Sequence, residues 1–236
     1  MAAAKKQKSG ICVYCGREGP ITDDHAPPRS FYPDPPPKNL ITVPCCEACN
    51  KSFAKDDDYV RLIFTTAEGL MDNPARNALL PTVKRFAERK ESKNILSSLH
   101  RSLESGYYPT ASGVLTKRQR FVIDGERLDA FAKRIVKAVF YREKGYPVPS
   151  GYMIHAINYR GFAEAQRVSG PNADFYQFIL HELISAEAQS WGGAFAYSWI
   201  QSPNDSNATW WLLEFFGKRM YLCNTFSDVS LPAQFT

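Results

Sequence analysis

The chain contains CVYC at residues 12–15, TDDH at residues 22–25 and CCEACNK at residues 45–51, all within its first sixty residues. Five of the six cysteines lie in this segment, and only Cys223 is distant. Two Cys-x-x-Cys pairs suit a tetrahedral Zn²⁺ bound by four thiolates at ~2.3 Å each. No apolar signal core follows the basic N-terminus, so we expect a metal site in a reducing cytoplasm and not a disulfide framework. The predicted zinc ligands are Cys12, Cys15, Cys46 and Cys49.

The segment from Ile11 to about Asp58 is rich in Cys, Pro and Gly and poor in apolar residues. Burial alone would not stabilise such a piece, whereas the binding energy of a metal becomes folding energy. Six prolines between Ala26 and Pro37 exclude a regular helix and predict a stiff, extended loop. Residues 39–44 (NLITVP) then predict a short strand leading into the second cysteine pair.

The spacer between the two cysteine pairs contains the candidate catalytic residues. Its thirty residues exceed the ~15–20 of an ordinary zinc ribbon, and the excess includes Asp24 and His25. A carboxylate is a hard oxygen ligand that suits Mg²⁺. A neighbouring imidazole, with an ordinary pKa of ~6.5, can accept a proton from water near neutral pH. Asn50 directly follows the last predicted zinc ligand, so its amide oxygen could complete a second metal site.

With these motifs, residues 11–58 resemble the HNH endonucleases, whose ββα-metal motif wraps one catalytic ion. They look closest to the four-cysteine branch typified by phage endonuclease VII. The resemblance implies that His25 is the general base and that Asp24 and Asn50 bind catalytic Mg²⁺ or Mn²⁺. It also implies that Asn39 holds the catalytic loop in shape and that the zinc is structural. The implied substrate is nucleic acid, DNA rather than RNA, with phage defence or restriction as a typical role.

A different class of function stays open. Cys-x-x-Cys pairs also occur in purely structural zinc modules, so the chain could be a catalytically silent module that binds nucleic acid or protein. In that case Asp24, His25 and Asn50 could be replaced without loss of function. A nuclease acting on RNA, or a toxin controlled by a partner, is a third hypothesis. A homo-oligomer or a regulatory protein partner is compatible with each of these.

The whole chain is predicted to be α+β. We expect a flexible basic tail (residues 1–10), the HNH domain (11–60), a basic helical segment (61–145) and a C-terminal α+β region with an antiparallel sheet (146–236). Three aspartates at residues 56–58 predict a helix start, where the helix dipole favours negative charge.

Residues 61–150 carry seventeen basic and nine acidic side chains, which is compatible with a polyanionic partner. The helical spacing of apolar residues from Leu128 to Phe140 predicts a core helix with a solvated basic side.

In the C-terminal region, the sequence pattern predicts strands at residues 152–159, 194–201, 208–216 and 220–225, and a helix at 173–189. No apolar run approaches the ~18–20 residues that span a membrane, so we expect no membrane partner and a cytoplasmic location.

Overall fold

The computed structural model describes residues 8–66, 84, 88, 90–110, 112–158, 171–217 and 219–227. Most of the predicted basic tail lies outside these residues, as do residues 67–83 of the predicted helical segment.

The N-terminal segment folds as strand, loop, strand and helix. The strands β1 (Ser9–Ile11), β2 (Glu18–His25) and β3 (Thr42–Cys46) form an antiparallel sheet in that order. A short 3-10 turn, η1 (Arg29–Phe31), lies in the loop between β2 and β3, and helix α1 (Glu47–Thr66) begins directly after β3.

Helix α1 begins earlier than the sequence predicted. Its first residue is Glu47, so the three aspartates at residues 56–58 lie in the middle of the helix and the prediction of a helix start there is wrong. The first turn is stabilised by Glu47 and Lys51, which form an ion pair of 2.5 Å at helical spacing. Each aspartate instead pairs with an arginine: Asp56 with Arg127, Asp57 with Arg134 and Asp58 with Arg61.

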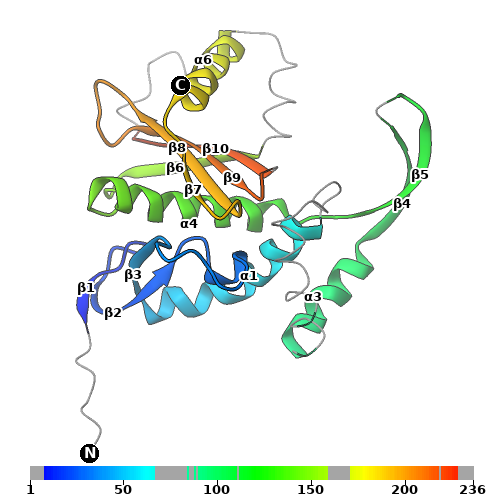
Figure 1. Cartoon of the computed structure of the whole chain (residues 1–236), viewed down its shortest axis with the longest axis horizontal. Coiled ribbons are helices and arrows are strands. Elements are labelled where there is room, and N and C mark those ends of the chain that lie inside the picture. The colour runs from blue at the N-terminus through cyan, green and yellow to red at the C-terminus, as the bar shows by residue number, and fades with distance from the viewer. Residues whose placement is uncertain are drawn as a thin grey trace, which may run out of the picture.

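The middle of the chain is not entirely helical, in contrast to the prediction for residues 61–145. Helix α3 (Lys90–Arg101) is followed by an antiparallel hairpin of β4 (Leu103–Pro109) and β5 (Leu115–Phe121). Between these strands the Gly113 N–H donates to the Thr110 carbonyl, and Gly113, with φ of +82°, adopts a conformation that other residues rarely adopt. The hairpin projects away from the rest of the molecule (Figure 1).

Helix α4 (Gly125–Lys144) lies between the N-terminal sheet and the C-terminal sheet (Figure 1). The Asp124 side chain caps it by accepting a hydrogen bond from the Arg127 N–H, and Gly145 ends it with φ of +79°. Its apolar face is buried as predicted, but its basic side is only partly solvated. Arg134 is only 7% exposed, and the half-buried Lys137 donates a hydrogen bond of 2.8 Å to the Tyr14 carbonyl. The packing of α1 against α4 removes Arg134 from water.

The C-terminal region confirms the predicted antiparallel sheet. Its strands are β6 (Tyr152–Asn158), β7 (Gln189–Trp191), β8 (Phe195–Gln201), β9 (Thr209–Phe215) and β10 (Arg219–Ser227), in the order β6-β10-β9-β8-β7. Helix α4 covers one face of this sheet, and helix α6 (Pro171–Ser185) covers the other (Figure 1). One cluster of buried residues runs from Cys12 to Cys223, so the N-terminal segment and the C-terminal sheet share a core.

Candidate metal centre and the adjoining Asp-His pair

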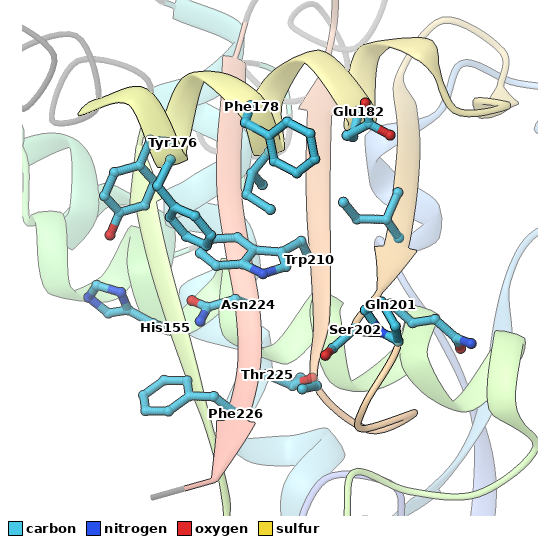
Figure 2. Close-up of a pocket in the computed structure, with 15 residues that line it drawn as sticks. His155, Tyr176, Phe178, Glu182, Gln201, Ser202, Trp210, Asn224, Thr225 and Phe226 are labelled. Atoms are coloured by element: carbon cyan, nitrogen blue, oxygen red, sulfur yellow. The ribbon is translucent and has the colours of Figure 1, made fainter. Parts of the chain in front are cut away.

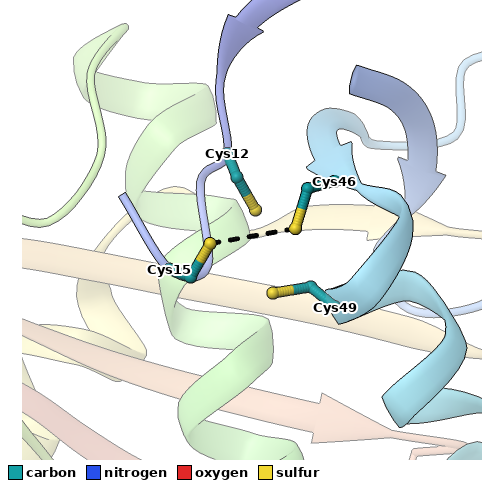
Figure 3. A group of neighbouring side chains, drawn as sticks. All are labelled: Cys12, Cys15, Cys46 and Cys49. Carbon is teal, nitrogen blue, oxygen red and sulfur yellow. Dashed lines mark hydrogen bonds between the residues drawn. The ribbon is translucent and has the colours of Figure 1, made fainter. Parts of the chain in front are cut away.

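The four predicted zinc ligands lie together. The sulfur atoms of Cys12, Cys15, Cys46 and Cys49 are all within 4.8 Å of one another, and those of Cys15 and Cys46 are 3.8 Å apart (Figure 3). A regular tetrahedron with Zn–S bonds of ~2.3 Å has sulfurs ~3.8 Å apart, so the cluster is compatible with a structural zinc ion.

Local backbone geometry presents the sulfurs. The first pair sits on a tight turn in which the Gly16 N–H donates to the Cys12 carbonyl and the Cys12 N–H donates to the Arg17 carbonyl. Gly16 has φ of +71°, a left-handed conformation that glycine adopts without steric cost. The second pair spans the junction of β3 and α1, because Cys46 ends the strand and Cys49 lies in the first helical turn.

The thiols differ in their readiness to ionise. Hydrogen bonds from Arg17 lower the pKa of Cys15 to about 6, whereas burial raises the pKa of Cys49. Cys45, the fifth cysteine of this segment, lies beside the cluster but is not one of its four members. Burial raises its pKa to about 12, and its thiol donates to the Cys46 carbonyl at 3.3 Å.

The Asp24 side chain lies on the inner face of the β2–β3 hairpin. In the ladder Asp24 is opposite Val43, which is buried, and His25 is opposite the exposed Thr42. Successive side chains of a strand point to opposite faces, so the two neighbours diverge. The Tyr14 hydroxyl donates to Asp24 Oδ2 at 2.7 Å. Burial and the nearby carboxylate raise the pKa of Tyr14, which keeps the hydroxyl protonated as a donor.

The ring of His25 is hydrogen-bonded to its cross-strand partner, Thr42. The distance between Thr42 Oγ1 and His25 Nδ1 is 3.1 Å, and the Thr42 hydroxyl donates its proton to the Leu40 carbonyl at 3.2 Å. With that proton on the Leu40 carbonyl, the hydroxyl is an acceptor for Nδ1–H, which corresponds to the Nδ1-protonated tautomer of His25. Nε2 of His25 then carries the lone pair and can accept a proton. Sequence reasoning did not identify Thr42, whose role follows only from strand register.

The two asparagines occupy different positions relative to the sheet. Asn50 is exposed on the first turn of α1, directly after the cysteine cluster. The side chain of Asn39 is exposed, and its backbone carbonyl accepts a hydrogen bond of 2.8 Å from Trp191 Nε1. The contact that holds the loop at this position therefore comes from strand β7 of the C-terminal sheet, 152 residues away in sequence.

Packing contacts at Phe31 and at Pro37 hold the proline-rich loop in place. Phe31 is fully buried and stacks on Phe131 of α4 and on Phe216, with ring centroids 5.3 and 5.9 Å apart. Pro37 lies against Gly192, where an added Cβ would be only 3.2 Å from the proline ring. Aromatic packing and this close approach fix the loop that joins the His25 strand to the Thr42 strand.

A basic groove adjoins the cysteine cluster. It has a volume of about 470 Å³ and lies between the start of α1, helix α4 and strand β6. Its cationic side chains are Lys133, Arg134 and Lys137, all from α4, and Cys49 and Phe53 form its opposite wall. The positive charge of α4, which the sequence placed in solvent, thus lies next to the candidate metal centre.

Comparison with protein-family models, with curated proteins and with solved structures finds no match to this chain. Within the part of the chain that the structure describes, no helix is both long and apolar enough to cross a membrane.

Proposed function

We propose that this protein is a metal-dependent endonuclease that hydrolyses phosphodiester bonds of nucleic acid, with DNA as the expected substrate. The observation that carries the proposal is the arrangement around β2. The strand ends in Asp24 and His25, the Thr42 hydroxyl is hydrogen-bonded to Nδ1 of His25 and not to Nε2, and Asn50 lies in the first turn of α1. A carboxylate, an imidazole and an amide are the residue types that metal-assisted activation of water uses, which supports the proposal.

Each residue has a distinct proposed role. Nε2 of His25 takes a proton from the attacking water. Asp24 and Asn50 would hold a divalent cation, Mg²⁺ or Mn²⁺, which when bound supplies positive charge to stabilise the phosphorane-like transition state. Tyr14 orients Asp24 by occupying Oδ2, which leaves Oδ1 for the cation. Asn39 would hold the loop between β2 and β3 in shape.

The cysteine cluster has a structural role in this proposal. A zinc ion bound by four thiolates has no open coordination position, so it does not act on the substrate. It would instead fix the start of α1, and with it the position of Asn50. Loss of zinc is therefore expected to abolish cleavage indirectly, through the fold.

Positive charge near the proposed site supports a polyanionic substrate. Lys133 and Lys137 line the groove beside Cys49, and the β5 strand of the projecting hairpin has the sequence LTKRQRF. Lys117 in that strand is exposed, and its cross-strand partner Tyr107 is 70% exposed. A two-stranded ribbon of this kind fits the major groove of duplex DNA, where basic side chains contact phosphates.

Plasmid cleavage by the zinc-loaded full-length chain tests the proposal. Purified protein is incubated with supercoiled plasmid and Mg²⁺ or Mn²⁺, and His25→Ala is assayed beside it. His181→Ala is the matched control, because His181 is exposed on α6 and takes no part in the proposed site. Nicking by wild type and His181→Ala, with loss in His25→Ala, is the expected result.

Two outcomes would count against a nuclease. Equal cleavage by wild type and His25→Ala would exclude His25 as the base and point to a contaminating enzyme. Absence of cleavage of plasmid and of single-stranded RNA, by protein with one zinc per chain and wild-type circular dichroism, would favour the silent zinc module. Retained binding of nucleic acid by Asp24→Ala and His25→Ala would then support that alternative.

A further inference from the structure

A second pocket lies on the C-terminal sheet, on the face opposite α4. It has a volume of about 600 Å³ and is bounded by helix α6 and by strands β6, β8, β9 and β10 (Figure 2). The size falls within the ~300–1,000 Å³ of pockets that bind small molecules. Because α4 and the N-terminal segment pack on the other face of the sheet, this pocket is separate from the proposed nuclease site (Figure 1).

The floor of the pocket is a row of side chains that crosses four strands. The ladder pairs His155 with Asn224, Asn224 with Trp210, and Trp210 with Ile200. Cross-strand partners project from the same face of the sheet with their Cβ atoms ~4.5–5.5 Å apart. The imidazole and the amide therefore lie side by side next to the indole, as Figure 2 shows.

The walls of the pocket are aromatic. Phe175 and Tyr176 from α6 meet the Trp210 ring edge to face, with centroids 5.7 and 6.1 Å away and interplanar angles of 69° and 83°. Such contacts hold the indole in a defined orientation. Phe178 on α6 and Phe226 on β10 extend the wall, and Phe178 is 59% exposed. A flat ring placed among these side chains would gain stacking and burial without rearranging the pocket.

The charges of the side chains that line the pocket restrict the kind of ligand that can bind. Among the described residues that line it, Glu182 is the one charged side chain, and none is lysine or arginine. A phosphate group would find no cationic partner there. The polar groups at the floor are instead an amide, which both donates and accepts, and an imidazole. These groups select a neutral planar ring with a hydrogen-bonding edge over a purely apolar ring.

We propose that this pocket binds the planar nitrogen heterocycle of a nucleobase, with Asn224 and His155 hydrogen-bonding its edge beside Trp210. An amide pairs with both a donor and an acceptor on one base edge, which is how Asn and Gln recognise adenine. The remaining volume has room for an attached ribose. A free nucleoside and an unpaired base of a nucleic acid strand share this chemistry, and the experiment distinguishes these two sources.

Isothermal titration of the full-length, zinc-loaded His25→Ala protein tests the site. The probes are the four ribonucleosides, their 5′-monophosphates, and an eight-nucleotide single strand with or without its bases. Asn224→Leu removes the amide at nearly constant volume, and the matched control is Asn204→Leu, on the exposed loop between β8 and β9. We expect at least one nucleoside to bind, no more weakly than its monophosphate, and Asn224→Leu to weaken binding by ~10- to 100-fold.

The outcomes separate the alternatives. Binding of a free nucleoside that Asn224→Leu weakens and Asn204→Leu does not would support the pocket as a nucleoside site. Binding only of the base-containing strand, with the same dependence on Asn224, would support capture of an unpaired base. If Asn224→Leu fails to fold, His155→Ala, on the edge strand, must give the same loss. Binding unaffected by both variants, or no binding by any probe, would overturn the proposal whether or not the protein cleaves DNA.

Discussion

Replacing Arg134 tests the contact that joins α4 to α1. The Arg134 side chain is 7% exposed, pairs with Asp57 and lies over the rings of Phe53 and Phe131, 4.3 and 5.0 Å from their centroids. In Arg134→Met the apolar stem is kept, and the Asp57 carboxylate, which is only 21% exposed, loses its opposing charge. Because removal of one partner of a buried ion pair costs about 3–5 kcal/mol, we expect the free energy of unfolding to fall by at least ~3 kcal/mol. That is a large share of the roughly 5–15 kcal/mol that stabilises a typical protein.

The chain provides a matched control on the same two helices. Arg127 and Asp56 form an ion pair of 2.7 Å, but their side chains are 32% and 42% exposed. Arg127→Met should therefore lower the free energy of unfolding by no more than ~1 kcal/mol, the usual range for an exposed pair. The double variant Arg134→Met/Asp57→Leu should recover most of the lost stability, since replacing both partners with apolar side chains is often close to neutral. Urea unfolding of zinc-saturated protein, followed by circular dichroism, measures all three.

The loss of stability in Arg134→Met should depend on pH in a definite direction. Burial outweighs the neighbouring Arg134 and raises the pKa of Asp57 to about 6 in the wild type. Loss of the guanidinium raises this pKa further, so the folded variant takes up a proton above the pH at which the folded wild type does. A protein becomes more stable as pH falls wherever its folded state binds more protons than its unfolded state. The difference in free energy of unfolding between wild type and Arg134→Met should therefore shrink as pH falls from about 8 to about 6. A deficit below ~1 kcal/mol at the higher pH, or one that grows as pH falls, would refute the buried ion pair as the source of stability.

Three further predictions concern the metal centre and the proposed site. Cys49→Ser should lose the bound zinc and most of the N-terminal fold, whereas Cys45→Ser should keep one zinc per chain, as metal analysis by mass spectrometry would measure. Thr42→Val should slow plasmid cleavage by at least ~10-fold while circular dichroism and zinc content stay unchanged, because His25 loses the partner that fixes its tautomer; an unchanged rate would exclude that role. Lys117→Ala should weaken binding of duplex DNA and reduce the slope of log K against log salt by ~1, measured by fluorescence anisotropy, and a slope equal to wild type would remove the hairpin from the interface.

The C-terminal sheet was accessible to prediction because its strands are short runs rich in aromatic and other apolar residues, such as TWWLLEF in β9 and FAYSWIQ in β8. The hairpin of β4 and β5 was missed because its strands are mostly exposed, so apolar periodicity gives little signal there. The start of α1 was misplaced because acidic residues at 56–58 match a helix N-terminus, whereas they are partners of arginines distant in sequence or one turn away.

The sequence by itself determined the four-cysteine cluster, since two Cys-x-x-Cys turns can satisfy one tetrahedral metal whatever surrounds them. It also determined which residue types accompany the cluster, including Asp24, His25 and Asn50. Only the tertiary structure decided what holds those residues. Strand register places Thr42 beside His25, the ring of Trp191 reaches the loop at Asn39, and α4 brings its cations against α1. These contacts join residues far apart in the chain, so they depend on how whole helices and strands pack together. The spacing of residues within a short stretch of sequence therefore does not predict them.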